Sequence, residues 1–242
     1  MQNISRKLIF CLGTLSVLTA LSLPANAQTR SQVSGDSGAK QAQTLFLRAD
    51  IGSTTFDSKA AASKETASST AYEFGGWFGE ARIVGMSIKN QTDVVDFSLN
   101  DSQSSTNFTD VRLKARLWGI VPSIGVSLSE VDVETTDGKT VGLFGTGVNA
   151  GLGFTFTIYT GIVLSAEAMT VQSTHVFDKL ALGNNLGVRN EADANISFDI
   201  TDRLIDLLVG YRVRNYEIET PTSVFQEKAQ GVYAGLRLGV YF

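Results

Sequence analysis

Cysteine, proline and histidine are almost absent from this chain of 242 residues, which has one cysteine, one histidine and three prolines. The cysteine is Cys11, so everything after it is without disulfides, thiolate nucleophiles or cysteine-bound metals. Proline cannot donate a hydrogen bond to a β-ladder, and its scarcity beside 23 glycines is typical of a sheet-rich chain.

Positive charge and long apolar runs are also scarce after residue 27. Arg6 and Lys7 are the charged residues of the first 27, so the remainder has fewer basic than acidic residues. A surface of this kind does not suit nucleic acid, and we expect no nucleic-acid partner. No stretch after residue 27 is long and apolar enough for a transmembrane helix.

The N-terminal segment has the pattern of an export signal. Two basic residues precede an apolar run over residues 8–23, and Ala25-x-Ala27 is a small-residue cleavage site. The run is short for a spanning helix, so an uncleaved anchor is the weaker reading. We predict a signal peptide over residues 1–27, cleaved after Ala27, and a flexible periplasmic lead-in over residues 28–43.

Apolar and polar residues alternate from residue 44 to the end of the chain. The alternation predicts ten strands, each with one apolar and one polar face. The expected strands are 44–56, 71–79, 81–99, 108–120, 123–134, 140–157, 162–175, 189–200, 204–218 and 228–242. Short turns are expected near Glu80, at Val121-Pro122, at residues 159–161 and at Asp202-Arg203, and the other connections are longer and polar.

The last strand resembles a known family. Alternating apolar residues (Val232, Ala234, Leu236, Leu238, Val240 and Phe242) end the chain. This pattern resembles the terminal strand of bacterial outer-membrane β-barrels, where the barrel assembly machinery reads such a signal, here Leu236, Leu238, Val240 and Phe242. Loop lengths that alternate between short and long fit that family too.

The resemblance covers residues 44–242 as one domain. It implies an all-β fold, a closed antiparallel up-and-down transmembrane β-barrel of ten strands with meander topology. It also implies a monomer in the cell outer membrane, in contact with lipid and lipopolysaccharide. Eight or twelve strands, and a soluble barrel with its apolar face inward, are the alternatives.

If the apolar faces meet lipid, the other faces line the barrel, which must close because lipid offers no hydrogen bonds to a free sheet edge. A charge facing lipid would cost about 2–4 kcal/mol near the midplane, whereas charges inside can pair. Trp77 and Trp118 fall on the same inward phase, unless a bulge turns them outward. The predicted interior polar network is Arg48, Asp50, Glu73, Arg112, Lys114, Arg116, Glu167, Asp193, Asp199, Asp206, Arg212, Arg214 and Arg237.

A two-residue turn at Asp202-Arg203 predicts one register. The opposing pairs are Asp193 with Arg212, Glu191 with Arg214, and Asp199 with Asp206. The last pair consists of two carboxylates, which repel each other unless water or an arginine such as Arg203 relieves them. A cation held between them is the alternative.

His175 is the candidate catalytic residue, because a rim histidine with an acid or hydroxyl partner would suit hydrolysis. The omptin proteases carry an Asp-x-His pair, and Ser173 occupies that position here. The lipid A deacylase uses His-x-Ser, and Val176 and Phe177 follow His175 instead. Gly145-Thr146-Gly147 lacks the strand–turn–helix context of a phosphate loop. We therefore expect no catalytic, cofactor-binding or metal-binding residues.

The sequence thus favours a non-enzymatic barrel with an envelope-structural or surface-contact role through its extracellular loops. One alternative is a narrow diffusion channel, which the basic row Arg112, Lys114 and Arg116 would bias towards anions. The other is a rim-site hydrolase that uses His175.

Overall fold

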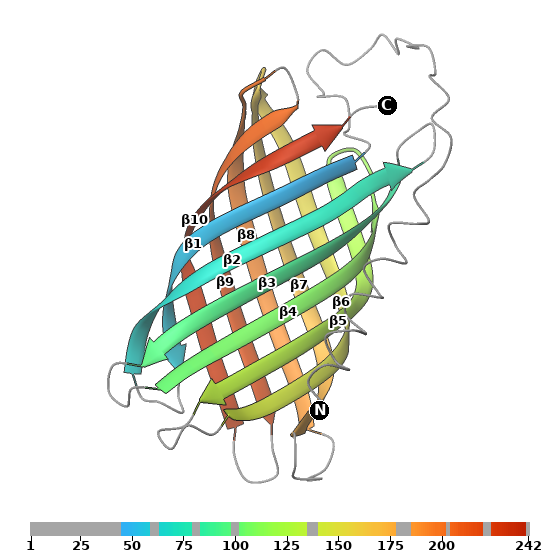
Figure 1. The fold of residues 1–242 in the computed structure, drawn as a ribbon. Helices are drawn as coiled ribbons and strands as arrows, with labels where there is room; N and C mark the ends of the chain where they lie inside the picture. Colours follow the sequence, from blue (N-terminus) through green and yellow to red (C-terminus); the bar gives the residue numbers. More distant parts are fainter. Residues whose placement is uncertain are drawn as a thin grey trace, which may run out of the picture. The chain divides into compact units, whose positions relative to one another are not determined.

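Ten antiparallel strands form a closed barrel in the computed structural model, with each strand paired to the next and β10 paired to β1 (Figure 1). The strands are β1 (Leu45–Ser58), β2 (Ser63–Phe78), β3 (Val84–Phe97), β4 (Ser102–Ala115), β5 (Ile120–Glu134), β6 (Thr140–Tyr159), β7 (Ile162–Phe177), β8 (Asn185–Asp199), β9 (Ile205–Glu219) and β10 (Val224–Val240). The fold class, the strand number and the meander order predicted from the sequence are confirmed.

The structure describes residues 45–58, 63–78, 83–97, 102–134, 140–177, 185–201, 204–219 and 224–240. The predicted signal peptide and lead-in lie outside these residues, as do Glu80, Asp202-Arg203 and Phe242. Within the described ranges, no helix is long and apolar enough to cross a bilayer.

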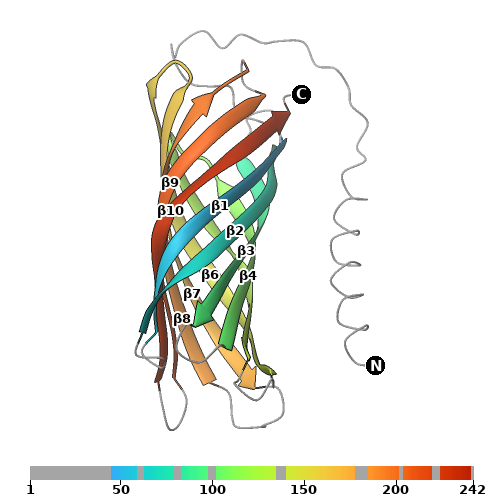
Figure 2. The ribbon, with the colours of Figure 1, turned by 60° about the vertical axis from the view of Figure 1, so that its left-hand side comes forward.

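The first and last strands close the sheet. β1 pairs with β10 from Leu45 opposite Val240 to Ser58 opposite Glu227, and the two strands lie side by side in Figure 2. Because this seam runs the full length of β1, it leaves no free edge there to demand hydrogen bonds from lipid.

Two tight turns lie at the barrel end where β1 begins and β10 ends (Figure 1). Trp118 and Gly119 join β4 to β5, both with positive φ (47° and 86°), as a two-residue hairpin turn of type I′ requires. The predicted turn at Val121-Pro122 is wrong, because both residues belong to β5. The predicted turn at residues 159–161 is confirmed, with Gly161 at φ 85°.

Several strands begin earlier than the sequence predicted. β2 begins at Ser63 rather than at 71, and β4 begins at Ser102 rather than at 108. β8 and β10 each gain four residues at the same, loop-bearing end. The extensions of β2 and β4 are rich in serine and threonine, which is why the sequence analysis placed them in loops.

Apolar side chains cover the outer wall near the tight turns. Leu47, Val209 and Leu238 are about half exposed on this wall. We call this part of the barrel the lipid-facing half: residues 45–52, 71–78, 84–89, 110–128, 148–170, 192–201, 204–213 and 232–240. Most strands have eight or nine residues in it, which at roughly 3.3 Å per residue and about 40° of tilt span about 20–23 Å, close to the roughly 25 Å of an apolar band.

The rest of each strand forms the water-facing half. Its outer face is mostly polar on β1–β5, β9 and β10, with Ser53 and Thr55 on β1 and Glu219 on β9. On β6–β8 it also exposes Phe144, Val176, Leu186 and Val188. Its interior holds two apolar clusters. One consists of Phe108, Val131, Leu143, Tyr216 and Ile218, and the other of Phe56, Ala67, Val95 and Ala229.

Candidate functional site: the charged barrel interior

Arg112 lies at the centre of the lipid-facing interior and is 1% exposed. Its Nη1 donates to Glu167 Oε1 at 2.5 Å, and its Nη2 donates to Glu73 Oε1 at 3.0 Å. Lys114 Nζ donates to the same Glu73 oxygen at 2.8 Å. One arginine therefore ties β4 to β2 and, across the lumen, to β7.

Arg212 is the centre of a second group of ion pairs on the opposite wall. Its Nε donates to Asp193 Oδ2 at 2.9 Å, and its Nη1 donates to Asp50 Oδ1 at 3.3 Å. Arg48 contacts the same two carboxylates, with Nε 3.0 Å from Asp50 Oδ2 and Nη2 3.6 Å from Asp193 Oδ2. Asp193 lies opposite Arg212 in the β8–β9 ladder, so the predicted register is confirmed.

Tyr233 completes this second group from β10. Its hydroxyl donates to Asp193 Oδ1 at 2.6 Å, and its ring lies under the guanidinium groups of Arg48 and Arg212. The ring crosses Gly210 of β9, where a Cβ would come within 2.4 Å of the tyrosine. Glycine is needed at 210 for this close approach.

Arg237 neutralises a carboxylate near the turn end. Asp199 lies opposite Asp206, as predicted from the register. Arg237 of β10 donates to Asp206 Oδ2 from Nη2 at 2.6 Å and from Nε at 3.0 Å. The sequence analysis had assigned such a role to Arg203, which lies outside the described residues.

Three further buried ion pairs lie farther from the turn end of the barrel: Lys89 with Glu191, Arg189 with Asp110, and Arg214 with Asp93. The sequence analysis missed Lys89, Asp93, Asp110 and Arg189, although all of them fall on the inward phase of their strands. Glu191 does lie opposite Arg214 in the ladder, but each side chain has its closest ion pair elsewhere. If the alternation of inward and outward residues had been followed along the whole of each strand, it would have identified Lys89, Asp93, Asp110 and Arg189.

The two tryptophans point in different directions. Trp77 is 8% exposed inside the barrel, and the Arg116 guanidinium lies 4.1 Å from the centroid of its ring. Trp118 is fully exposed, because the positive φ of its turn projects it away from the barrel. The expected inward phase therefore holds for Trp77 and fails for Trp118.

His175 is completely buried in the water-facing half. Its Nε2 lies 2.5 Å from the Tyr216 hydroxyl and 3.2 Å from Ser129 Oγ. Gly145 and Gly187 make room for the ring, since a Cβ on either would come within 2.4 Å of it. Burial lowers the pKa of His175 to about 4, so the imidazole is neutral at pH 7. The side chain is enclosed and does not stand at an open rim.

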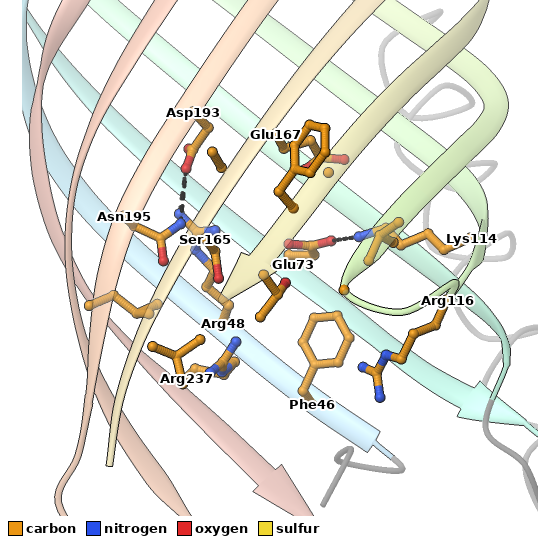
Figure 3. A pocket seen from close by; sticks show the side chains of 18 of the residues that line it. Phe46, Arg48, Glu73, Lys114, Arg116, Ser165, Glu167, Asp193, Asn195 and Arg237 are labelled. Carbon is orange, nitrogen blue, oxygen red and sulfur yellow. Dashed lines mark hydrogen bonds and ion pairs between the residues drawn. The ribbon is translucent and has the colours of Figure 1, made fainter. Parts of the chain in front are cut away.

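A cavity of about 370 Å³ occupies the lipid-facing interior at the turn end (Figure 3). Its walls carry the charges of Arg48, Glu73, Lys114, Arg116, Glu167, Asp193 and Arg237. Among the described residues, no group of three or more histidine, cysteine or acidic side chains is placed to hold a metal ion.

A closed antiparallel barrel with an apolar outer band and a charged interior is a transmembrane β-barrel. No protein-family model and no curated protein matches the chain.

Solved structures of similar fold include Neisserial surface protein A (NspA), at 15% identity over 83% of this chain and 100% of that chain, with a TM-score of 0.42. The outer-membrane protease OmpT from Escherichia coli is 11% identical over 82% of this chain and 94% of its own, with a TM-score of 0.49. The transport unit of the Escherichia coli autotransporter AIDA-I is 10% identical over 87% and 94%, with a TM-score of 0.49. These similarities concern the fold alone.

Proposed function

We propose that this chain is an outer-membrane barrel that is closed to solutes and acts without catalysis, in envelope structure or in surface contact through its loop-bearing end. The observation that carries the proposal is the apolar interior of the water-facing half. In outer-membrane barrels the short turns face the periplasm and the longer loops face outward. The water-facing half then stands outside the membrane.

Every strand contributes to the closure. The two apolar clusters draw side chains from β1 to β6, β9 and β10. At this level β7 contributes His175 and β8 contributes Arg189, both buried. An ion in transit would lose its water against apolar side chains and gain no hydrogen bonds in return, which is a large cost.

The outer wall supports the proposed partners. Leu236, Leu238 and Val240 project from the lipid-facing half of β10, each about half exposed. With Phe242, they would present the assembly signal to the barrel assembly machinery before insertion and would contact lipid afterwards. The polar outer face of the water-facing half would lie among lipopolysaccharide head groups, with the closed barrel present as a monomer.

Conductance of the folded protein tests the closure. The mature chain is refolded, its folding is verified by heat-modifiable gel mobility, and it is inserted into planar bilayers. We expect no steady conductance. A Phe56→Ala/Phe108→Ala/Ile218→Ala variant, which hollows both apolar clusters, serves as the open control and should conduct.

Steady conductance from folded wild-type protein would overturn the closure and favour the narrow channel. Substitution of Arg112, Lys114 and Arg116 should then change its anion preference. An esterase or peptidase activity that disappears in His175→Ala would overturn the non-enzymatic role in favour of the hydrolase.

A further inference from the structure

The outer face of β6, β7 and β8 keeps apolar side chains beyond the lipid-facing half. On most other strands the outer residues become polar at the edge of that half. On these three strands Phe144, Val176, Leu186 and Val188 are still about half exposed. Because β6, β7 and β8 are neighbours in the sheet, these side chains form one surface that continues the lipid-facing wall.

A hollow of about 620 Å³ lies in the outer wall directly beside this surface. The outward side chains that line it are Ala150, Leu152, Ala168, Thr170, Asn190, Ala192, Val213 and Asn215. Leu152 lies opposite Ala168, and Ala192 lies between Ala168 and Val213 in the next two ladders. Two methyl groups therefore lie between two longer side chains, and the wall is indented over β7 and β8.

The apolar part of this hollow suits a hydrocarbon chain. Water needs two to four polar partners, which the alanine methyl groups do not supply. An empty hollow would forfeit the dispersion contacts of its lining. The hollow opens outward on the wall that lipid covers, so an acyl chain of the bilayer can enter it without crossing any polar surface.

The loop-side end of the hollow is polar but uncharged. Thr170 lies opposite Asn190, and Asn190 lies opposite Asn215, so the three form one row across β7, β8 and β9. Among the described residues, the exposed side chains of Thr170 and Asn190 make no hydrogen bond. A hydroxyl and an amide can both donate and accept, and they can bind the carbonyl or hydroxyl groups of a lipid at the edge of the apolar band.

The charges around this row disfavour an anionic head group. In the described parts of β6–β9, no outward side chain is a lysine or an arginine. Glu217 and Glu219 follow Asn215 on the outer face of β9. Anionic lipids are recognised by basic clusters, and a phosphate here would meet two carboxylates instead.

We propose that the outer face of β6–β9 binds one lipid whose head region is uncharged and forms hydrogen bonds, as in a neutral glycolipid. One acyl chain would fill the hollow over Ala168 and Ala192. The head region would bind the row of Thr170, Asn190 and Asn215. This site deepens the lipid contact proposed above and rests on that proposal only for the leaflet, which is the outer one when the loop-bearing end faces outward.

Retention of lipid by the folded barrel tests the site. The mature chain is refolded in lauryldimethylamine oxide, a detergent without a sugar, and its folding is verified by heat-modifiable gel mobility. It is then incubated with equal amounts of monogalactosyl diacylglycerol and phosphatidylglycerol that carry the same acyl chains. Native mass spectrometry should find one galactolipid per barrel, preferred over phosphatidylglycerol by about fivefold or more.

Three variants locate the bound lipid. Ala168→Leu/Ala192→Leu fills the hollow and should abolish the retention of galactolipid. Ala49→Leu/Ala234→Leu makes the same changes on the lipid-facing outer wall of β1 and β10, and it should retain galactolipid as wild type does. Asn190→Lys adds a cation to the polar row and should shift the preference towards phosphatidylglycerol.

A folded wild-type barrel that retains no galactolipid, or that prefers phosphatidylglycerol, would overturn the proposal. Equal retention by wild type and folded Ala168→Leu/Ala192→Leu would do so too. A lipid-free dimer that separates when the hollow is filled would replace the lipid with a second copy of the chain. Conductance keeps the two proposals apart, since a conducting barrel that retains galactolipid refutes the closure alone, and a silent barrel that retains none refutes the lipid site alone.

Discussion

The lipid-facing and water-facing halves of this barrel are built from the same ten strands but distribute their apolar residues differently between the two faces of the wall. On β1, Leu47 and Ile51 point outward in the first half, and Phe56 points inward in the second. On β9, Val209 points outward and Ile218 inward. The strand geometry is the same in the two halves of the barrel, and only the medium outside the wall differs.

This difference shows that the solvent of the outer face decides which face is apolar. Where lipid covers the wall, charged residues are confined to the interior and must find partners there. Where water covers the wall, the interior also holds apolar clusters, as in soluble proteins, beside the buried ion pairs of Arg189 and Arg214. The change falls between Ile51 and Ser53 on β1, and between Val213 and Asn215 on β9, which marks the edge of the apolar outer band.

Removal of Arg212 should have the largest effect, because it leaves Asp50 and Asp193 buried with fewer partners. Arg212→Leu should lower the free energy of unfolding by about 3–5 kcal/mol, measured by urea titration in lipid vesicles. Lys228→Gln, on the water-facing outer wall, should change it by less than about 0.5 kcal/mol. A loss below about 1 kcal/mol for Arg212→Leu would mean that water, and not ion pairing, stabilises the buried carboxylates of the lipid-facing half.

An arginine moved along the outer face of β9 should test the boundary itself. Val209→Arg places a charge in the lipid-facing band and should cost about 2–4 kcal/mol. Glu217→Arg, eight residues further on the same outer face, should stay within about 0.5 kcal/mol of wild type. Equal costs for the two variants, in the same urea titration, would place the membrane boundary elsewhere.

The alternation of the sequence predicted much of the fold for a physical reason. Strands in lipid need a strict period of two, so strand number, topology and the Asp193–Arg212 register could be read from it. The strand beginnings at Ser63 and Ser102 were missed, because a polar outer wall in water has the composition of a loop. The turn at Trp118-Gly119 was missed because proline, not positive φ, was taken as its signal.

Contacts across the lumen could not be predicted in the same way. The pair of Arg112 with Glu167 joins strands three apart in the sheet, and the pair of Lys89 with Glu191 joins strands five apart. Such pairs depend on the tilt and stagger of the closed barrel, which strand periodicity does not contain. The inward position of these residues is local information, whereas their partners are set by the closed geometry.

The water-facing interior should show a pH dependence of its own. Glu227 is buried near Arg214 and Asp93, and burial raises its pKa to about 7. A raised pKa means that the folded barrel holds this proton more tightly than the unfolded chain, so stability is full below about pH 4.5 and falls as the pH rises to 7. Glu227→Gln should therefore raise stability by about 3 kcal/mol at pH 8 and leave it nearly unchanged at pH 4.5.

The control for this prediction is Glu219→Gln on the exposed outer face of β9, which should show neither effect. The stability contributed by His175 depends on pH in the opposite direction, because its pKa is lowered. This contribution is lost as the pH falls from 6.5 to 4. That acid loss should persist in Glu227→Gln. Because the opposite change at His175 can mask a fall in the wild-type profile, the test is the difference between the two proteins: equal stability of wild type and Glu227→Gln at pH 8 would contradict the burial of Glu227.

The smallest change in the free energy of unfolding is expected when an asparagine on the outer wall is replaced by alanine, and a buried asparagine serves for comparison. Asn90, on the outer face of β3, donates from Nδ2 to Asn107 Oδ1 at 2.8 Å and to Thr109 Oγ1 at 2.9 Å. Asn149 makes a similar pair of bonds inside, to Ser127 Oγ at 2.9 Å and Val126 O at 3.0 Å. Asn90→Ala should cost about 0.5–1 kcal/mol and Asn149→Ala about 1–3 kcal/mol, because water replaces only the outer bonds. If urea titrations give equal costs, the interior at Asn149 is as wet as the outer wall, and the contrast between the two faces fails at that level.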